Sequence, residues 1–225
     1  MGSKNKLKRF AENETFDNLF QLSYEQLYQE DFHLKGKWSK EFFKNDNPII
    51  LELGCGKGEY TIGLARQKPD CNFIGVDIKG ARLWRGLKTA HEQNMKNVAF
   101  LRTRIELINN YFSENEVSEI WITFPDPQPR NSREKKRLTS PRFLERYRHF
   151  LKKDGVIHLK TDSDLLYQYT MDSLEAHSNP VEYHTEDLYA IAEEMEVKQI
   201  RTFYEQIWLG QGLKIKYIRF GLKNE

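Results

Sequence analysis

Cysteine is scarce in this chain, and its scarcity excludes two kinds of site. The 225 residues include only Cys55 and Cys71, and no Cys-x-x-Cys pair occurs. Zinc knuckles and disulfide frameworks need more cysteines at defined spacings, so neither is predicted. The histidines lack a matching set of ligands, and we therefore expect no metal site.

Long apolar runs are also missing. No segment approaches the roughly 18–20 apolar residues that a membrane span needs, and the N-terminus has no signal-peptide core. These absences predict a cytoplasmic protein that contacts no membrane. With 39% hydrophobic and 30% charged residues, the chain suits one soluble domain with a single core.

The chain carries little net charge, +2, but its charges are unevenly distributed. Residues 1–10 carry four cations and no acid, whereas residues 182–196 carry six acids and no Lys or Arg. Residues 130–137 hold five further basic side chains. A polyanion would be attracted to the two basic regions and repelled by the acidic one.

Short apolar runs, rich in Ile, Val, Leu or Phe, recur after Pro48. They predict buried strands at residues 49–54, 72–78, 97–103, 119–125 and 155–161. The segments between them predict helices at residues 60–67, 80–94 and 140–153, the last with Ser140 as N-cap and Pro141 in the first turn. This alternation is typical of parallel βαβ units and predicts a doubly wound α/β sheet.

The two ends of the chain depart from this alternation. After about residue 198 we expect two extended segments around residues 210–212, forming a hairpin that closes one sheet edge. Residues 1–47 are interpreted as a basic and aromatic extension, which either packs over the domain at 48–225 or orders on a partner. For its aromatic side chains, docking on the domain is favoured over stacking on RNA; these are Tyr24, Tyr28 and Phe32.

The segment "LELGCGKGEY" (51–60) ends the first predicted strand with Gly54, Gly56 and Gly58. Glycines let a backbone pass close to a ligand, and such a turn delivers the ligand to the next helix. The nicotinamide fingerprint needs its third glycine where this chain has Glu59. Glu52 and Glu59 would repel a pyrophosphate, but they suit a cofactor with a cationic centre and an ammonium group. S-adenosylmethionine has both.

Asp77 ends the second predicted strand, nineteen residues after Gly58. An acid at this place is able to accept both ribose hydroxyls of an adenosine. The alternative is a structural glycine turn in which Asp77 only caps the following helix.

The fourth predicted strand ends at "TFPDPQP", where Pro125, Pro127 and Pro129 restrict the backbone around Asp126. Ligands of open α/β sheets lie at the carboxyl ends of the strands, so Asp126 is expected to face the same crevice as Asp77. There it would hydrogen-bond the amino group of a base and stabilise positive charge on an alkylated ring nitrogen. The alternative is a strained loop that only shapes the pocket.

The basic run that follows has the composition of a segment that binds a phosphate backbone. Such runs are also common on solvated surfaces. At this point the sequence resembles a known family. "FPDPQPRNSREKKRLTSPRFL" is similar to the signature of the bacterial tRNA (guanine-N7-)-methyltransferases. The similarity continues through "ELGCGKG", "FIGVDI", "HLKTDS" and "TFYE", from about residue 49 to the C-terminus.

This resemblance implies a Rossmann-like class I methyltransferase fold, with a mostly parallel seven-stranded sheet and a C-terminal antiparallel hairpin. It also implies methyl transfer from S-adenosylmethionine to N7 of a guanine in the tRNA variable loop. Motif matches place the cofactor contacts at Glu52, Gly54, Gly56, Gly58, Asp77, Arg104, Ile105 and Asp126. They place the substrate and RNA contacts at Arg130, Ser132, Arg133, Glu134, Lys135, Lys136, Arg137, Asp162, Thr202, Phe203, Tyr204 and Glu205.

Asp126 and Asp162 are the predicted catalytic residues. N7 of guanine has a lone pair and no proton to lose, so the reaction needs positioning and stabilisation of a cationic ring rather than a strong base. Asp162 has an alternative role as the N-cap of the next helix. Without the motif match, Thr202 and Glu205 would be interpreted as surface residues of a strand.

The chain departs from the family pattern at three places. Gln128 replaces the usual Trp, and Arg130 replaces the usual Lys with a different donor geometry. Arg104 and Ile105 stand where the family commonly has an Asp and a small residue that hold the adenine. A backbone amide would then replace that acid in adenine recognition.

Two alternative functions remain open beside tRNA methylation. One is a non-catalytic RNA-binding module with a vestigial cofactor pocket, and the other is a methyltransferase for a protein or small molecule. The glycine spacing disfavours a nicotinamide oxidoreductase. The predicted partner is tRNA. No feature of the sequence requires a partner subunit, and both a monomer and a homodimer are compatible with it.

Overall fold

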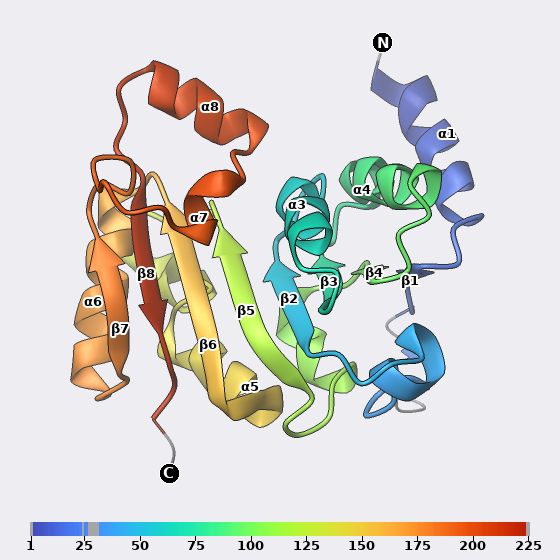
Figure 1. Ribbon diagram of the computed structural model, residues 1–225, viewed down its shortest axis with the longest axis horizontal. Helices are drawn as coiled ribbons and strands as arrows, with labels where there is room; N and C mark the ends of the chain where they lie inside the picture. The colour runs from blue at the N-terminus through green and yellow to red at the C-terminus, as the bar shows by residue number, and fades with distance from the viewer. Residues whose placement is uncertain (1, 24, 27–31, 224–225) are drawn as a thin grey trace.

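One eight-stranded sheet runs through the molecule, in the order β1-β4-β3-β2-β5-β6-β8-β7 (Figure 1). The computed structural model describes residues 2–23, 25–26 and 32–223. The strands are β1 (Leu19–Phe20), β2 (Ile49–Leu53), β3 (Asn72–Val76), β4 (Val98–Leu101), β5 (Val117–Thr123), β6 (Leu151–Thr161), β7 (Val181–Thr185) and β8 (Lys216–Phe220). Strands β1 to β6 pair in parallel, and β8 runs antiparallel to both β6 and β7.

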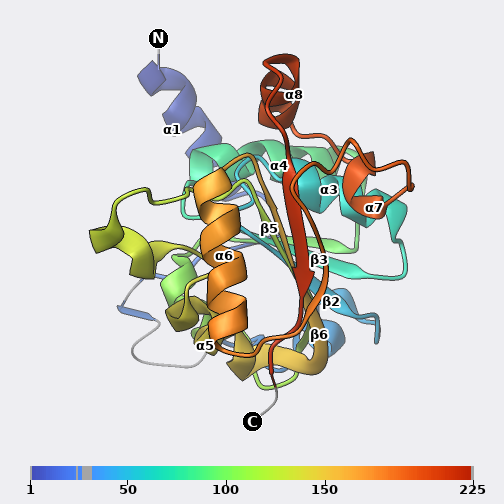
Figure 2. The ribbon, with the colours of Figure 1, turned by 90° about the vertical axis from the view of Figure 1, so that its left-hand side faces the viewer.

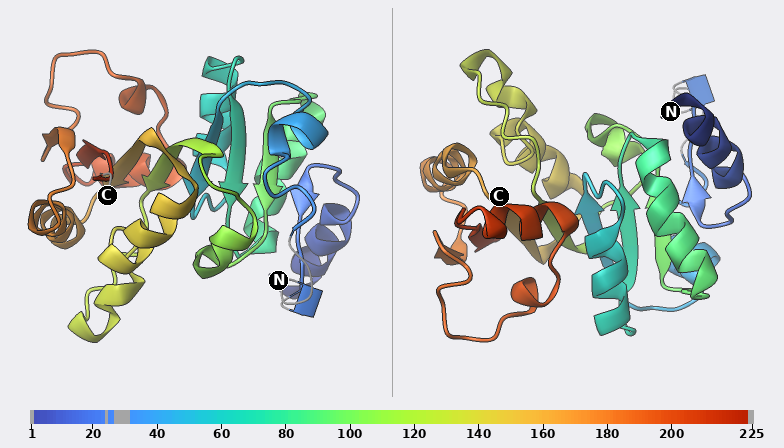
Figure 3. Two further views of the ribbon diagram at one scale, coloured as in Figure 1. Left: turned by 90° about the horizontal axis from the view of Figure 1, so that it is seen from below. Right: turned by 90° about the horizontal axis from the view of Figure 1, so that it is seen from above.

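Helices cover both faces of the sheet (Figures 2 and 3). The α-helices are α1 (Gly2–Asn13), α3 (Glu59–Gln67), α4 (Gly80–Glu92), α5 (Pro141–Phe150), α6 (Asp164–Ala176), α7 (Glu196–Gln199) and α8 (Phe203–Gly210). Shorter helical segments are the π-helical η1 (Trp38–Phe43) and the 3-10 turns η2 (Ile105–Asn110) and η3 (Asn131–Lys136). One apolar core lies under η1, η2, α5 and α6, and a second lies under α3, α4 and α7. Parallel strands with both faces covered are buried throughout, as in β2, whose residues are all buried.

The predicted α/β class and its mostly parallel sheet are confirmed. The five predicted strands correspond to β2 through β6, and the C-terminal strands are antiparallel as expected. The sheet has eight strands rather than seven. The predicted helix at 140–153 is too long, because it ends at Phe150 and Leu151 already begins β6.

The predicted hairpin around residues 210–212 is wrong. The segment before it is the helix α8, and the antiparallel partner of β8 is β7, from earlier in the chain. A capping box explains the helix: the Thr202 side chain accepts from the Glu205 amide, and the Glu205 carboxylate accepts from the Thr202 amide. The apolar run Ile207–Leu209 therefore continues a helix and does not form a strand.

The first 47 residues are packed against the rest of the chain where they are described. β1 adds an edge strand beside β4, and Trp38 is fully buried, stacked on Phe112. Phe32 also lies in the core, whereas Tyr24 and Tyr28 fall outside the described residues. α1 packs on α4. Across residues 2–23, 25–26 and 32–223, no helix is long and apolar enough to cross a membrane.

Candidate active site

Two adjoining cavities open at the carboxyl ends of the central strands, and Gly54, Arg82 and Phe124 line both of them. The larger cavity measures about 470 Å³ and contains Asp77, Arg104, Ile105 and Asp126 among its lining residues. The smaller measures about 290 Å³ and contains Glu52, Gly56, Thr202, Tyr204 and Trp208. The strand order explains why these residues lie close together. β2, β3 and β5 are neighbouring parallel strands, so their carboxyl ends lie at the same edge of the sheet.

The glycine turn after β2 lines the cavities. Gly54 and Gly56 have φ of +79° and +58°, and a Cβ built on either would meet no atom within 4 Å. Glycine therefore leaves open space for a ligand at these two positions. Gly58 has a packing role, since its Cβ would lie 2.8 Å from the Phe100 ring.

Asp77 ties this turn to the end of β3. Its Oδ2 accepts a hydrogen bond from the Gly56 amide at 2.9 Å, and its Oδ1 accepts from the Lys79 amide at 2.7 Å. The side chain is half-buried and lines the larger cavity. Each carboxylate oxygen retains a second lone pair, so Asp77 is able to accept hydroxyl groups from a ligand as well.

Asp77→Asn tests this role. We expect a loss of about 10- to 100-fold in affinity for S-adenosylhomocysteine, because the amide replaces an acceptor with a donor at a charge-assisted hydrogen bond. Calorimetric titration measures the affinity directly. Asp70→Asn, an exposed acid two residues before β3, is the control and should bind as the wild type does. Equal affinity in both variants would contradict the assignment.

The far end of the larger cavity is formed where β4 leads into η2. Arg104 is exposed there and Ile105 is half-buried, so both predicted adenine-side residues reach the cavity. Glu106 also lines it, two residues after the position of the family's usual acid. The motif match did not indicate Glu106, although this carboxylate stands only two residues after the position of that acid.

Glu52 lies on the buried side of the smaller cavity. Its Oε2 accepts from the Thr61 amide at 2.7 Å and from the Thr61 hydroxyl, and its Oε1 accepts from the Thr123 hydroxyl at 2.8 Å. Burial raises the pKa of Glu52 to about 7, although these hydrogen bonds oppose the rise. A cationic group in the cavity would favour the ionised form of this carboxyl.

The Asp126 loop is held from below by a buried arginine. Asp126 is exposed, lines the larger cavity and accepts a hydrogen bond from the Gln128 amide at 3.0 Å. Arg137 donates to the carbonyls of Pro127 and Gln128 at 3.2 and 3.1 Å, and its guanidinium lies 4.2 Å from the centre of the Tyr169 ring. These contacts fix a backbone that has φ of +45° at Gln128.

The position of Arg137 separates it from the other predicted RNA contacts. Its side chain is only 4% exposed, whereas every residue from Arg130 to Lys136 is exposed. Of these, only Lys136 lines the larger cavity. The geometry gives Arg137 the role of supporting the loop, whereas the residues before it are exposed to solvent.

Arg137→Lys should lower the free energy of unfolding by about 2 kcal/mol, because lysine keeps the charge but loses the planar fork that reaches two carbonyls. Urea denaturation measures the change. Arg133→Lys, exposed on the same loop, should change it by less than about 0.5 kcal/mol. Indistinguishable midpoints for the two variants would argue against a supporting role.

Asp162 directly follows β6. The side chain is half-buried, and its carboxylate makes no hydrogen bond or ion pair with residues that the structure describes. The N-cap of α6 is Ser163, whose hydroxyl accepts from the Leu166 amide at 3.2 Å, so the alternative of Asp162 as that cap is wrong. Asp162 lines neither cavity.

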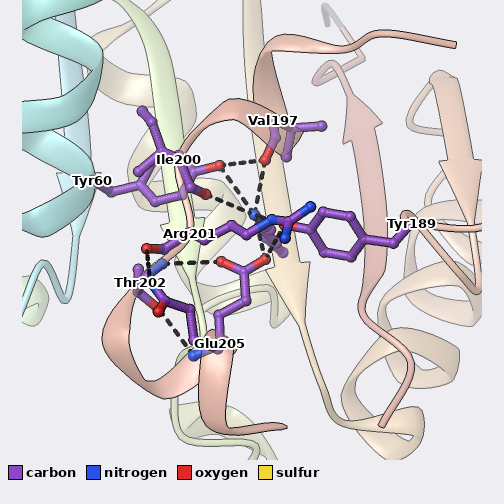
Figure 4. Close-up of polar contacts among 9 residues, drawn as sticks. Tyr60, Tyr189, Val197, Ile200, Arg201, Thr202 and Glu205 are labelled. Carbon is purple, nitrogen blue, oxygen red and sulfur yellow. Dashed lines mark hydrogen bonds and ion pairs between the residues drawn. The ribbon is translucent and has the colours of Figure 1, made fainter. Parts of the chain in front are cut away.

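The "TFYE" residues divide between the cavity and the interior. Thr202 and Tyr204 line the smaller cavity, and Phe203 is 53% exposed beside it, with its amide bonded to Glu59 at 3.1 Å. Glu205 is fully buried. Figure 4 shows its polar contacts with Thr202 and Tyr189. The expectation of a surface strand is therefore wrong for Glu205, since helix formation turns its side chain toward the sheet.

Lys160, near the end of β6, is the partner of Glu205 and was missed in the sequence. Its ammonium lies 2.6 Å from Glu205 Oε1 with no exposed surface. Burial lowers the pKa of Lys160 to about 8, although Glu205 raises it. The signal was a lysine inside the apolar run "GVIHLKT", because a buried cation needs a buried acid. In the described ranges, no group of three or more His, Cys, Asp or Glu is placed to hold a metal ion.

Two solved structures with a similar fold are methyltransferases. The 16S rRNA methyltransferase KamB matches with a TM-score of 0.65 over 87% of this chain and 96% of its own, at 13% identity. An antibiotic-related methyltransferase matches with a TM-score of 0.61 over 86% and 97%, at 19% identity. The chain therefore has the fold of the class I methyltransferases, with the glycine turn and its strand-end acid at the carboxyl ends of the strands.

Sequence comparisons place the chain within that class. A family model described as putative methyltransferase matches residues 46–218. The tRNA (guanine-N(7)-)-methyltransferase of Christiangramia forsetii is 58% identical over 99% of this chain and 100% of its own. The enzyme of the same name from Clostridioides difficile is 38% identical over 81% and 83%. The chain belongs to the tRNA (guanine-N7-)-methyltransferase family.

Proposed function

We propose that this enzyme transfers a methyl group from S-adenosylmethionine to N7 of a guanine in tRNA, and that the guanine lies in the variable loop. The observation that carries the proposal is full-length similarity to enzymes of that name, combined with an exposed basic segment beside the crevice. Single-domain enzymes of this kind need a donor pocket, a base pocket and a cationic surface. The chain provides a candidate for each.

The larger cavity fits the adenosine half of the cofactor. The glycine backbone faces open space there, Asp77 offers acceptors for ribose hydroxyls, and Glu106 offers one for an amino group. Glu52 lines the smaller cavity and suits the ammonium of the methionine half. When bound, S-adenosylmethionine supplies a methyl group on a sulfonium centre, for which the carboxylates around the crevice provide a favourable field.

The guanine is expected where the two cavities adjoin, next to Phe124, which lines both of them. Because N7 has a free lone pair, the protein must orient the ring and exclude water rather than remove a proton. Asp126 lines the adjoining larger cavity, and Asp162 follows β6 at the same edge of the sheet. Both would accept hydrogen bonds from the edge of the guanine and stabilise the positive charge that the ring gains. Thr202 and Tyr204 form the opposite wall.

A direct assay tests the proposal. The protein is incubated with methyl-labelled S-adenosylmethionine and unmodified tRNA, and the labelled nucleotide is then mapped. We expect one 7-methylguanine in the variable loop. Label at another base would contradict the chemistry, label elsewhere in the tRNA would contradict the position, and binding of tRNA without label would favour a non-catalytic module.

A further inference from the structure

The C-terminal wall of the smaller cavity is attached to the sheet by a buried ion pair. Lys160 belongs to β6 and Glu205 to α8, and their charged atoms are 2.6 Å apart with no exposed surface. Figure 4 shows the polar groups around Glu205. α8 also carries Tyr204 and Trp208, which line the cavity. The position of this wall therefore depends on the pair.

Other polar groups surround the two charges. Lys160 donates to the carbonyls of Val197 and Ile200 at 2.8 and 3.2 Å, so it also holds the segment that leads into α8. Glu205 accepts from the Tyr189 hydroxyl at 2.6 Å and from the Thr202 amide at 3.2 Å. With Lys160 this gives the carboxylate three donors, and none of its surface faces a substrate.

Lys160 reaches the other wall of the crevice through its backbone. Its carbonyl accepts from the Phe124 amide at 2.8 Å, at the start of the loop that carries Asp126. Phe124 lines both cavities, and its ring centre lies 4.9 Å from that of Trp208 on α8. One residue of β6 thus connects the Asp126 loop with α8.

We propose that Lys160 and Glu205 are positioning residues for methyl transfer, which hold α8 and the Asp126 loop at the separation that receives the guanine. In this role Glu205 acts through Lys160 and does not contact the base. The inference rests on the proposed function, since it assigns a task to residues around the same crevice.

Charge-removing variants test the pair. Glu205→Gln leaves Lys160 as a buried cation without its anion, and Lys160→Met leaves the opposite defect, whereas the double variant leaves neither. We expect each single variant to lower kcat at saturating tRNA by at least about 30-fold, because α8 leaves its active position for most of the time. The double variant should regain at least about tenfold relative to Glu205→Gln.

The recovery separates positioning from direct contact. If Glu205 touched the guanine, the double variant would remain as inactive as Glu205→Gln, and that result would overturn the inference. If the single variants do not fold, the activity of the double variant is compared with that of the wild type. A positioning role requires the double variant to retain activity. Amide exchange gives an independent signal: in Glu205→Gln, residues 196–213 should exchange faster while β2 and β5 remain unchanged.

Lys68→Met is a matched control. Lys68 and Glu196 form an ion pair at 2.8 Å that attaches α7 to α3, but neither residue lines a cavity. This variant should retain kcat within about threefold, and a loss equal to that of Lys160→Met would also overturn the inference. Wild-type protein that does not methylate tRNA would contradict the proposed function itself. Active wild type without recovery in the double variant would contradict only the positioning role.

Discussion

Asp162→Ala should lower kcat for tRNA methylation by about 100- to 1,000-fold while S-adenosylhomocysteine binds within about threefold of wild type. The substitution removes a carboxylate proposed to stabilise charge on the guanine, and one such electrostatic contact is worth about that much. Asp162 lies outside the larger cavity, so the adenosine contacts remain. Single-turnover methylation measures the first quantity and calorimetry the second.

The control for this prediction is Asp172→Ala, which removes an exposed acid of α6 far from the carboxyl end of β6. It should methylate at the wild-type rate. Equal loss of cofactor affinity and rate in Asp162→Ala would show that Asp162 supports the pocket as a whole. An unchanged rate would exclude it from the reaction.

Replacing Arg133, Lys135 and Lys136 together with alanine should weaken tRNA binding and reduce its salt dependence. All three side chains are exposed on η3 beside the larger cavity. Each phosphate contact that is lost should lower the slope of log K against log salt by about 0.7–0.9, so the full set lowers it by about 2–3. Binding titrations between 50 and 200 mM salt, roughly the range where such slopes are resolved, provide the measurement.

Lys152→Ala/Lys153→Ala is the matched control. Both lysines are exposed near the start of β6, at the opposite end of the sheet from the crevice (Figure 1). The control should keep the wild-type slope. If the slope stays unchanged in the triple variant, η3 is only solvated surface. If the slope falls in the triple variant and in the control alike, the attraction of tRNA is non-specific.

The strand–helix alternation could be predicted from the sequence, because the local hydrophobic patterns and the tertiary structure agree there. Strands β2 and β3 are mostly apolar and buried on both faces, and such a run has no stable alternative to burial. The glycine turn, Asp77 and Asp126 were also correctly brought to one crevice, because strand ends in an open parallel sheet converge on one edge.

The C-terminal segment shows where sequence patterns were insufficient. Residues 203–210 are apolar and aromatic enough for a strand, but Thr202 and Glu205 form a capping box that begins a helix. The same eight residues therefore lie across the carboxyl ends of the strands as α8 (Figure 1). β8 then pairs with β7 as well as with β6. This pairing depends on the tertiary arrangement of the sheet edge and not on a local turn.

The sequence by itself determined the class of fold, the place of the crevice and the family, because strand periodicity, glycine spacing and motif order are local properties of the chain. Only the tertiary structure decided that Arg137 supports a loop and that Glu205 is paired with Lys160. The side chains of Glu205 and Lys160 come from positions 45 residues apart, and no local pattern specifies which buried charge will meet which. Burial makes such pairing obligatory, but the packed fold selects the partner.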